Sequence, residues 1–234
     1  TADQAKTVIS LALQHGQLSY TDENNYSNYI GWYESGAGEY LGFWTQEDSE
    51  EVKKALIVVD MINGFIKEGN MADETINHFT PNIIKLIEET LSKEEGLAFI
   101  RDTHNKQSTE FKKFPLHCLQ GTNESELIDE LKKYEGYGLT YKKNSTSTMF
   151  AKNFMSDIDK MKQLRKVIVT GCCTDICVLN LAIPLINYFD EIDREVEVVV
   201  KEDAIETYDA PYHNRDEYNE MALKLMKQAG VRVE

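Results

Sequence analysis

A cysteine stands where a buried strand is expected to pass into a helix. Residues 167–169 are apolar and β-branched, as in a strand covered on both faces, and a glycine ends the run two residues later. Thr174 and Asp175 carry side-chain oxygens that can cap a helix, and the apolar spacing of residues 176–183 is helical. We therefore expect Cys177 in the first helical turn, where unpaired backbone N–H groups and the helix dipole favour a thiolate. This placement makes Cys177 a candidate nucleophile.

A cysteine nucleophile needs a group that takes its proton and a cation that stabilises the resulting charge. Asp60 ends another apolar run and could accept the proton, while Lys142 or Lys143 could hold thiolate and carboxylate together by Coulomb attraction. Each residue also has an ordinary explanation, since a buried cysteine commonly serves as a small core side chain, Asp60 could cap a helix, and the lysines could be solvated. The neighbouring Cys172 and Cys173 are expected to be structural. The occurrence of all three residue types at strand ends favours catalysis.

A second group of polar residues follows a further apolar run. It offers two carboxylates and two imidazoles, namely Asp102, His104, Glu110 and His117. Asp102 and His104 are two residues apart, so in an extended chain they point the same way. Two neutral imidazoles with two carboxylates suit Zn²⁺, Fe²⁺ or Mn²⁺. The alternative is a polar loop with one core histidine, and Cys118 is expected to face the core. The remaining histidines are expected to be structural or exposed: His15, His78 and His213.

Apolar runs and helical patterns alternate from residue 54 onward. Strands are expected at residues 55–60, 96–102, 137–142, 167–169, 196–200 and 231–233. Helices are expected at residues 80–91, 125–134, 151–161, 176–183 and 216–229. In the first of these helices Thr80 would be the cap and Pro81 the first helical residue.

This alternation predicts an α/β fold, a parallel sheet of about six strands with helices on both faces. In such sheets ligands bind just beyond the carboxyl ends of the strands. That rule selects Asp60, Asp102, the loop at residues 142–150, and Cys177. The side chains that could take part in catalysis or bind a metal are thus expected at one edge of the sheet.

The composition restricts the classes of partner. The 234 residues carry a formal net charge of −15, with 40 acidic and 25 basic residues, which disfavours nucleic acid and anionic membranes. No apolar run approaches the roughly 20 residues of a membrane span, and no signal-like segment opens the sequence. Four cysteines, three of them crowded together, do not form a disulfide framework in a chain of this length. A reducing, cytoplasmic setting is expected.

The first 50 residues differ in character from the rest. Residues 20–45 are rich in aromatic side chains, including Trp32 and Trp44, and are interleaved with glycines. We expect residues 1–50 to be an extension of unknown role that packs against the domain at residues 51–234 or across a subunit contact. A homo-oligomer is also expected.

Four motifs in one order resemble those of the isochorismatase-like cysteine hydrolases, and within them the nicotinamidase (pyrazinamidase) branch. They are VVDMINGF at 58–65, DTH…E…FPLHC…GT at 102–122, KNSTS at 143–147 and TGCCTDICV at 170–178. The resemblance covers about three quarters of the chain, from residue 54 onward. It implies the family's Rossmann-like three-layer sandwich.

The resemblance also implies roles for individual residues. Asp60, Lys143 and Cys177 map onto the family's catalytic triad, with Lys143 preferred over Lys142 because it lies four residues before Ser147, as in the family's K-x-x-x-S pattern. Two phenylalanines map onto the positions that sandwich the substrate ring, Phe65 and Phe114. The metal-binding positions map onto the second polar group, Asp102, His104, Glu110 and His117, with zinc expected and iron or manganese as alternatives.

Two backbone features are implied as well. The Cys172–Cys173 peptide bond would be cis, and the N–H groups of Cys173 and Cys177 would form an oxyanion hole. The sequence departs from the family at Ile62, where many members have glutamine, and in the loop before Phe150, which is one residue longer. These departures affect the expected details of substrate recognition.

The implied activity is hydrolysis of nicotinamide to nicotinate and ammonia through a cysteine thioester, with a small-molecule amide as the partner. One alternative keeps the scaffold and changes the substrate to another small amide or a carbamoyl compound. Another is a non-catalytic protein that binds metal or senses oxidation through its thiol.

Overall fold

A six-stranded parallel sheet organises residues 51–234, the part of the chain that the computed structural model describes. Its strands are β1 (Lys54–Val59), β2 (Gly96–Asp102), β3 (Leu139–Lys143), β4 (Lys166–Cys172), β5 (Glu197–Glu206) and β6 (Arg232–Val233). They lie side by side in the order β3-β2-β1-β4-β5-β6. The predicted α/β fold is confirmed, and the aromatic-rich segment at 1–50 lies outside the described residues.

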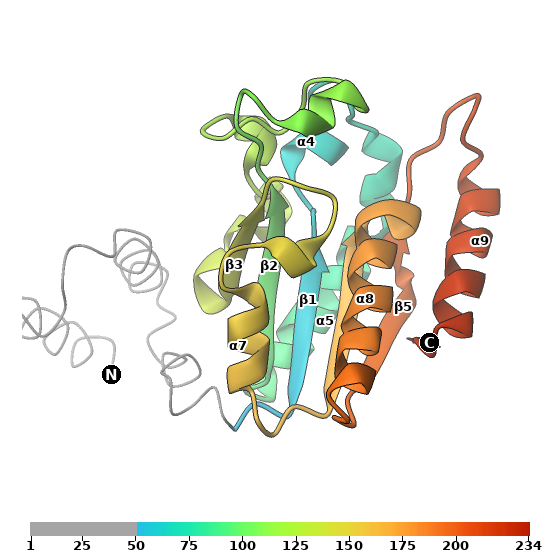
Figure 1. Ribbon diagram of the computed structural model, residues 1–234. Coiled ribbons are helices and arrows are strands. Elements are labelled where there is room, and N and C mark those ends of the chain that lie inside the picture. Colours follow the sequence, from blue (N-terminus) through green and yellow to red (C-terminus); the bar gives the residue numbers. More distant parts are fainter. Residues whose placement is uncertain (1–50) are drawn as a thin grey trace, which may run out of the picture.

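Helices cover both faces of this sheet. They are α4 (Asn63–Ile66), α5 (Thr80–Ser92), α6 (Asp129–Lys132), α7 (Phe154–Lys160), α8 (Leu179–Glu191) and α9 (Arg215–Gln228). In Figure 1, α7 and α8 lie in front of the sheet and α5 lies behind it. No helix between residues 51 and 234 combines the length and apolar character that crossing a membrane requires. All four cysteines are free thiols.

The central strand β1 is apolar from residue 55 to residue 59 because both of its faces are covered. Ala55, Ile57 and Val59 point into the core that contains α7, α8 and α9. Leu56 and Val58 point into the opposite core, which contains α4 and α5. Because successive side chains of a strand face opposite sides, a strand with helices on both sides needs an apolar residue at every position.

The predicted helix at residues 125–134 is wrong over most of its length. Ser125 ends a short 3₁₀ turn, the chain is extended at 126–128, and only α6 is α-helical. The extended residues pair with the segment after β1, since the N–H of Asn63 donates to the carbonyl of Glu126 and Ile62 forms a bridge with Leu127. These tertiary hydrogen bonds outweigh the local helical pattern.

The predicted cap of α5 is also wrong. Phe79 is the residue that precedes the helix, and Thr80 is already helical. The hydroxyl of Thr80 donates to the Asn77 side chain at 2.7 Å instead of accepting from the first turn. Pro81 does lie in the first turn, where its missing N–H costs nothing.

The strand order places the opening of the sheet at the carboxyl end of β1. The chain passes from β1 to β2 and β3 on one side, and β4, β5 and β6 lie on the other. Loops that leave neighbouring strands in opposite directions create a crevice at this reversal, which is where ligands bind in open α/β sheets. The ends of β1, β2, β3 and β4 meet there.

We expect Gly171→Ala to unfold the protein. Gly171 has a φ of +108°, and a Cβ added there would lie 2.0 Å from the carbonyl oxygen of Val59 on the neighbouring strand. The backbone clash and the strained conformation should together lower the free energy of unfolding by more than about 3 kcal/mol. Urea denaturation measures this change.

Gly121→Ala is the matched control for this substitution. Gly121 also has a positive φ, +79°, but no atom of residues 51–234 lies within 4 Å of an added Cβ. We expect a loss of about 1 kcal/mol from the backbone conformation alone. Equal losses at both sites would contradict the role of close strand packing at Gly171.

Candidate active site

Asp60 occupies the first position beyond β1 and is fully buried. Its backbone turns into the left-handed region with a φ of +51°, which aspartate tolerates better than most residues. Its Oδ1 accepts a hydrogen bond from the N–H of Asp102 at 2.9 Å. The carboxylate is thereby fixed at the opening of the sheet.

Lys143 ends β3, and its ammonium group lies inside the protein. Its Nζ is 2.9 Å from Oδ2 of Asp60 and 2.9 Å from Oδ1 of Asp102. The same Nζ donates to Sγ of Cys177 at 3.6 Å. One buried cation therefore joins the thiol, the nearby carboxylate and the second polar group, as expected of Lys143 and not of Lys142, whose side chain is exposed.

Cys177 lies in a π-helical turn, Thr174–Val178, and not in the first turn of an α-helix. The carbonyl of Cys173 accepts from the N–H groups of both Ile176 and Val178, each at 3.1 Å, which accounts for the wider turn. The predicted capping by Thr174 and Asp175 is wrong, because neither side chain caps the turn. The helix α8 begins only after this turn.

The electrostatics of this group differ from the predicted thiolate. Burial raises the pKa of Cys177 well above its ordinary value, although the nearby Lys143 acts in the opposite direction. Burial raises the pKa of Asp60 to about 6, a rise that Lys143 limits. Burial opposes the charge of Lys143, but Asp102 and Asp60 raise its pKa well above the usual range. The resting site thus holds a thiol beside a carboxylate and an ammonium.

The backbone before Cys177 has the implied geometry. The Cys172–Cys173 peptide bond is cis. The N–H of Cys173 has no acceptor within residues 51–234, and Cys173 lines the same cavity as Cys177. The thiol of Cys172 is buried and donates to the carbonyl of Asp60 at 3.2 Å, which agrees with its predicted structural role.

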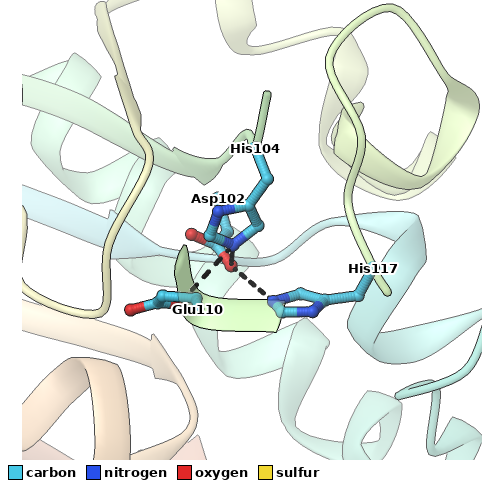
Figure 2. A group of neighbouring side chains, drawn as sticks. All are labelled: Asp102, His104, Glu110 and His117. Atoms are coloured by element: carbon cyan, nitrogen blue, oxygen red, sulfur yellow. Dashed lines mark hydrogen bonds and ion pairs between the residues drawn. The ribbon is translucent and has the colours of Figure 1, made fainter. Parts of the chain in front are cut away.

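The second polar group converges on one point (Figure 2). Its four members are Asp102, His104, Glu110 and His117, and all four side chains are buried. Each side chain offers one ligand atom, and these four atoms lie within 4.8 Å of one another. Oδ2 of Asp102 is 2.8 Å from Nε2 of His104 and 3.2 Å from Nε2 of His117. Oε2 of Glu110 is 3.7 Å from Nε2 of His104.

Each carboxylate of this group offers one oxygen and has the other held. Oδ1 of Asp102 accepts a hydrogen bond from Lys143. Burial alone would raise the pKa of Asp102, but Lys143 and the two imidazoles outweigh it and hold this pKa well below its usual range. Oε1 of Glu110 accepts from the N–H and the hydroxyl of Thr146, at 2.8 and 2.9 Å. Both carboxylates are therefore oriented by groups outside the cluster.

The two imidazoles are held in the same way. Nδ1 of His117 is 2.7 Å from the carbonyl of Pro115. Because a carbonyl oxygen can only accept a hydrogen bond, Nδ1 carries the proton. In the neutral ring, Nε2 then has a free lone pair for a metal. Nδ1 of His104 is 3.2 Å from the Asn144 side chain. Two oriented imidazoles and two oriented carboxylates fit a divalent metal of the zinc, iron or manganese type.

A cavity of about 380 Å³ opens onto both groups. Cys177, Asp102, Glu110 and His117 line it, and the two predicted aromatic residues do so as well. The ring centroids of Phe65 and Phe114 lie 5.7 and 6.3 Å from that of His117. A planar ring of modest size could therefore enter between the thiol and the metal-type cluster.

Other residues flagged in the sequence lie where they were expected. Cys118 is fully buried in the core that contains α5. The side chain of His78 is 62% exposed, and His213 is buried against tyrosine rings. His15 lies outside the described residues.

The sequence did not reveal several residues of the site. Thr146 lies within a motif, but the pattern gives no sign of its bond to Glu110. Tyr208, Asp209 and Tyr212 line the cavity from a loop after β5, about 30 residues beyond Cys177, and no local signal marks them. Only the parallel pairing of β4 with β5 brings this loop beside the cysteine turn.

A model of the isochorismatase domain matches residues 54–234. Nicotinamidase 1 of Arabidopsis thaliana is 33% identical over 175 residues, which cover 68% of this chain and 71% of that protein.

Solved structures share the fold. The N-carbamoylsarcosine amidase from Thermoplasma acidophilum is 25% identical, with a TM-score of 0.63 over 78% of this chain and 96% of that chain. The pyrazinamidase of Pyrococcus horikoshii, in complex with zinc, is 23% identical, with a TM-score of 0.60 over 78% of this chain and 98% of that chain. At this last identity the likeness concerns the fold alone.

Proposed function

The chain belongs to the isochorismatase family and is an amide hydrolase of that family, and from this we propose that it is a metal-dependent nicotinamidase. It would hydrolyse nicotinamide to nicotinate and ammonia through a thioester on Cys177. The observation that carries this proposal is the position of Lys143, whose ammonium lies between the thiol, Asp60 and Asp102. One buried cation thus couples a nucleophile with its base and with a metal-type cluster.

The first step is attack on the amide. Asp60 takes the proton of Cys177, and the thiolate forms a bond to the amide carbon while the carbonyl electrons move to oxygen. Lys143 stabilises the negative charge shared by the thiolate and the carboxylate as the proton moves. The N–H groups of Cys173 and Cys177 stabilise the oxyanion, an effect worth roughly 10²–10³ in rate per donor.

The second step releases ammonia and the third releases the acid. Asp60 returns the proton to the departing nitrogen as the carbon–nitrogen bond breaks, which leaves a thioester on Cys177. Water then attacks the thioester, and Asp60 accepts a proton from it. The second tetrahedral species breaks its carbon–sulfur bond and frees the acid, which ionises to nicotinate. Asp60 returns its proton to the departing sulfur, which restores the thiol and the carboxylate. Asp60 is suited to both directions of transfer because burial and Lys143 together place its pKa at about 6.

Asp102, His104, Glu110 and His117 would hold the metal. A divalent ion held there would supply a positive charge next to the cavity, toward which the substrate's electron-rich ring nitrogen would turn. Phe65 and Phe114 would pack against the faces of the ring. The zinc complex of the Pyrococcus horikoshii protein makes zinc the first metal to test.

The alternative substrate is a carbamoyl compound. The amidase from Thermoplasma acidophilum acts, by its name, on N-carbamoylsarcosine and shares the fold. The aromatic lining of the cavity favours a planar ring over that flexible anionic substrate. A larger kcat/KM on N-carbamoylsarcosine than on nicotinamide would reverse the assignment.

Ammonia release tests the proposal. The purified protein is incubated with nicotinamide before chelation, after chelation, and after addition of Zn²⁺, Fe²⁺ or Mn²⁺. We expect release that chelation removes and metal restores. No release from the metal-loaded protein would overturn the nicotinamidase assignment.

Thr146→Val tests the metal cluster without relying on turnover. Valine has nearly the shape of threonine but cannot donate its hydroxyl proton to Glu110, so one of the two bonds that orient this carboxylate is lost. We expect the affinity for Zn²⁺ to fall about tenfold, as for other outer groups that orient metal ligands. Competition with a chromophoric chelator measures the affinity.

Ser145→Ala is the control for that substitution. Within the described part of the chain, the one hydrogen bond of the Ser145 hydroxyl is to the carbonyl of Ser147 in the same loop, at 3.5 Å. Its loss should leave the zinc affinity unchanged. An equal affinity in Thr146→Val and the unaltered protein would show that Glu110 does not need this bond.

A further inference from the structure

The loop at residues 207–213, which follows β5, forms part of the cavity wall. Tyr208, Asp209 and Tyr212 line the cavity together with Cys173 and Cys177. None of these loop residues takes part in the chemistry described above. The position of this wall relative to the thiol nevertheless limits what can lie between them.

The cysteine turn holds one end of this loop. Asp175 lies two residues before Cys177 and directs its carboxylate away from the turn. Its Oδ1 accepts from the hydroxyl of Thr207 at 2.6 Å, and its Oδ2 lies 3.0 Å from Nε2 of His213. Both the carboxylate and the imidazole are largely buried, with 11% and 5% of the side chain exposed. Two hydrogen bonds thus join the two ends of the loop to the turn that carries the nucleophile.

His213 closes the loop on itself. Its ring stacks on that of Tyr208 with a centroid distance of 3.8 Å, and on that of Tyr218 from α9 with a distance of 3.7 Å. Its Nδ1 lies 3.0 Å from the carbonyl of Tyr208. The backbone groups of His213 and Ala210 also pair in both directions. The orientation of the Tyr208 ring therefore depends on the position of His213.

A second anchor lies at the rim of the cavity. Asp73, which also lines the cavity, accepts from the N–H of Asp209 and from Arg215, each at 3.0 Å. Arg215 donates in turn to the carbonyl of Thr207 at 2.9 Å. The loop is held at the rim as well as at the cysteine turn.

We propose that Asp175 and His213 are positioning residues that set the distance between the Tyr208 wall and Cys177, and so determine how tightly the amide substrate fits. This inference rests on the proposed function. The contacts explain why a carboxylate stands at Asp175 although it caps nothing, and why a buried imidazole stands between two tyrosines.

His213→Phe separates positioning from catalysis. Phenylalanine keeps a ring between the two tyrosines but loses both hydrogen bonds of the imidazole. We expect KM for nicotinamide to rise about tenfold and kcat to stay within about twofold, because Cys177, Asp60 and Lys143 are untouched. His78→Phe, at a largely exposed histidine, should change neither constant.

A binding measurement makes the test independent of turnover. Nicotinamide is titrated calorimetrically into metal-loaded Cys177→Ala and into the same variant with His213→Phe added. We expect the second protein to bind about tenfold more weakly. Thr207→Val, which removes a single bond to Asp175, gives the same test with less disturbance if His213→Phe does not fold.

The outcomes separate this inference from the proposed function. If the unaltered protein does not hydrolyse nicotinamide, the proposed function fails. If it does, and neither His213→Phe nor Thr207→Val changes KM or binding, the positioning role is wrong. A fall in kcat that parallels a fall in the free energy of unfolding, with KM unchanged, would show a purely structural role and would also overturn the inference.

Discussion

Cys177→Ala is expected to abolish turnover while leaving substrate and metal binding intact. The substitution removes the sulfur that attacks the amide carbon, which is the sulfur that the ammonium of Lys143 contacts. The loss in kcat should be on the order of 10⁴-fold or more, as for other nucleophiles that act through a covalent intermediate. The four metal-type residues do not include Cys177, so zinc affinity should not change. Ammonia release and zinc titration measure the two effects.

Cys118→Ala is the matched control. Cys118 is also a buried thiol, but it packs in the core that contains α5 and does not line the cavity. This substitution should lower stability and leave kcat within about twofold. Comparable turnover in Cys177→Ala and the unaltered protein would end the covalent mechanism.

Asp60→Asn is expected to lower kcat by about 10³-fold or more. Asparagine keeps the shape of the side chain and tolerates the positive φ of residue 60, so the backbone should be preserved. Its side-chain oxygen can still accept from the N–H of Asp102, but it can neither take the thiol proton nor return it to ammonia. General acid–base catalysis contributes roughly 10²–10⁴ in rate, and here one group would serve in both directions.

The control for this effect is an aspartate outside the site. Asp129 is 86% exposed, and among residues 51–234 its one ion pair is with Lys132 in its own helix. Asp129→Asn should leave kcat unchanged. If Asp60→Asn retained most of its activity with an unchanged free energy of unfolding, another group would have to be the base.

The main elements of the fold could be predicted because local signals and tertiary structure agree. The apolar runs within β1, β2 and β4 are buried on both faces, and residues 55–59, 97–100 and 167–169 are accordingly all apolar. The ends of these strands could then be placed at one edge by the rule for parallel sheets. Asp60, Asp102 and Cys177 were found in this way.

The predictions that were wrong concern features that depend on contacts between segments far apart in the sequence. The helical pattern at residues 125–134 gives way to pairing with the chain after β1, some 65 residues earlier. The caps expected at Thr174 and Asp175 are absent because Asp175 bonds to Thr207 and His213 instead. The thiolate expected at Cys177 is opposed by burial, which raises the pKa of the thiol, and the depth of burial is a property of the folded chain.

The metal-type cluster could be predicted in part from the sequence. Its four members could be identified as ligands by residue type, but their convergence within 4.8 Å follows from the turn after β2 and from the loop after β3. Thr146 and Asn144 belong to that second loop and hold Glu110 and His104. A motif that contains Lys143 thus also orients the cluster, which the sequence pattern alone could not show.

Trapping with hydroxylamine tests the central claim, that Cys177 carries the acyl group, most directly. Hydroxylamine attacks a thioester more readily than water does, so it diverts an acyl-enzyme to a hydroxamate. The metal-loaded protein is supplied with nicotinamide and increasing hydroxylamine, and both acyl products are quantified. We expect nicotinohydroxamate to form at the expense of nicotinate, and neither product to form with Cys177→Ala. Steady formation of nicotinate with no hydroxamate at any hydroxylamine concentration would mean that water attacks the amide directly, and would contradict the account.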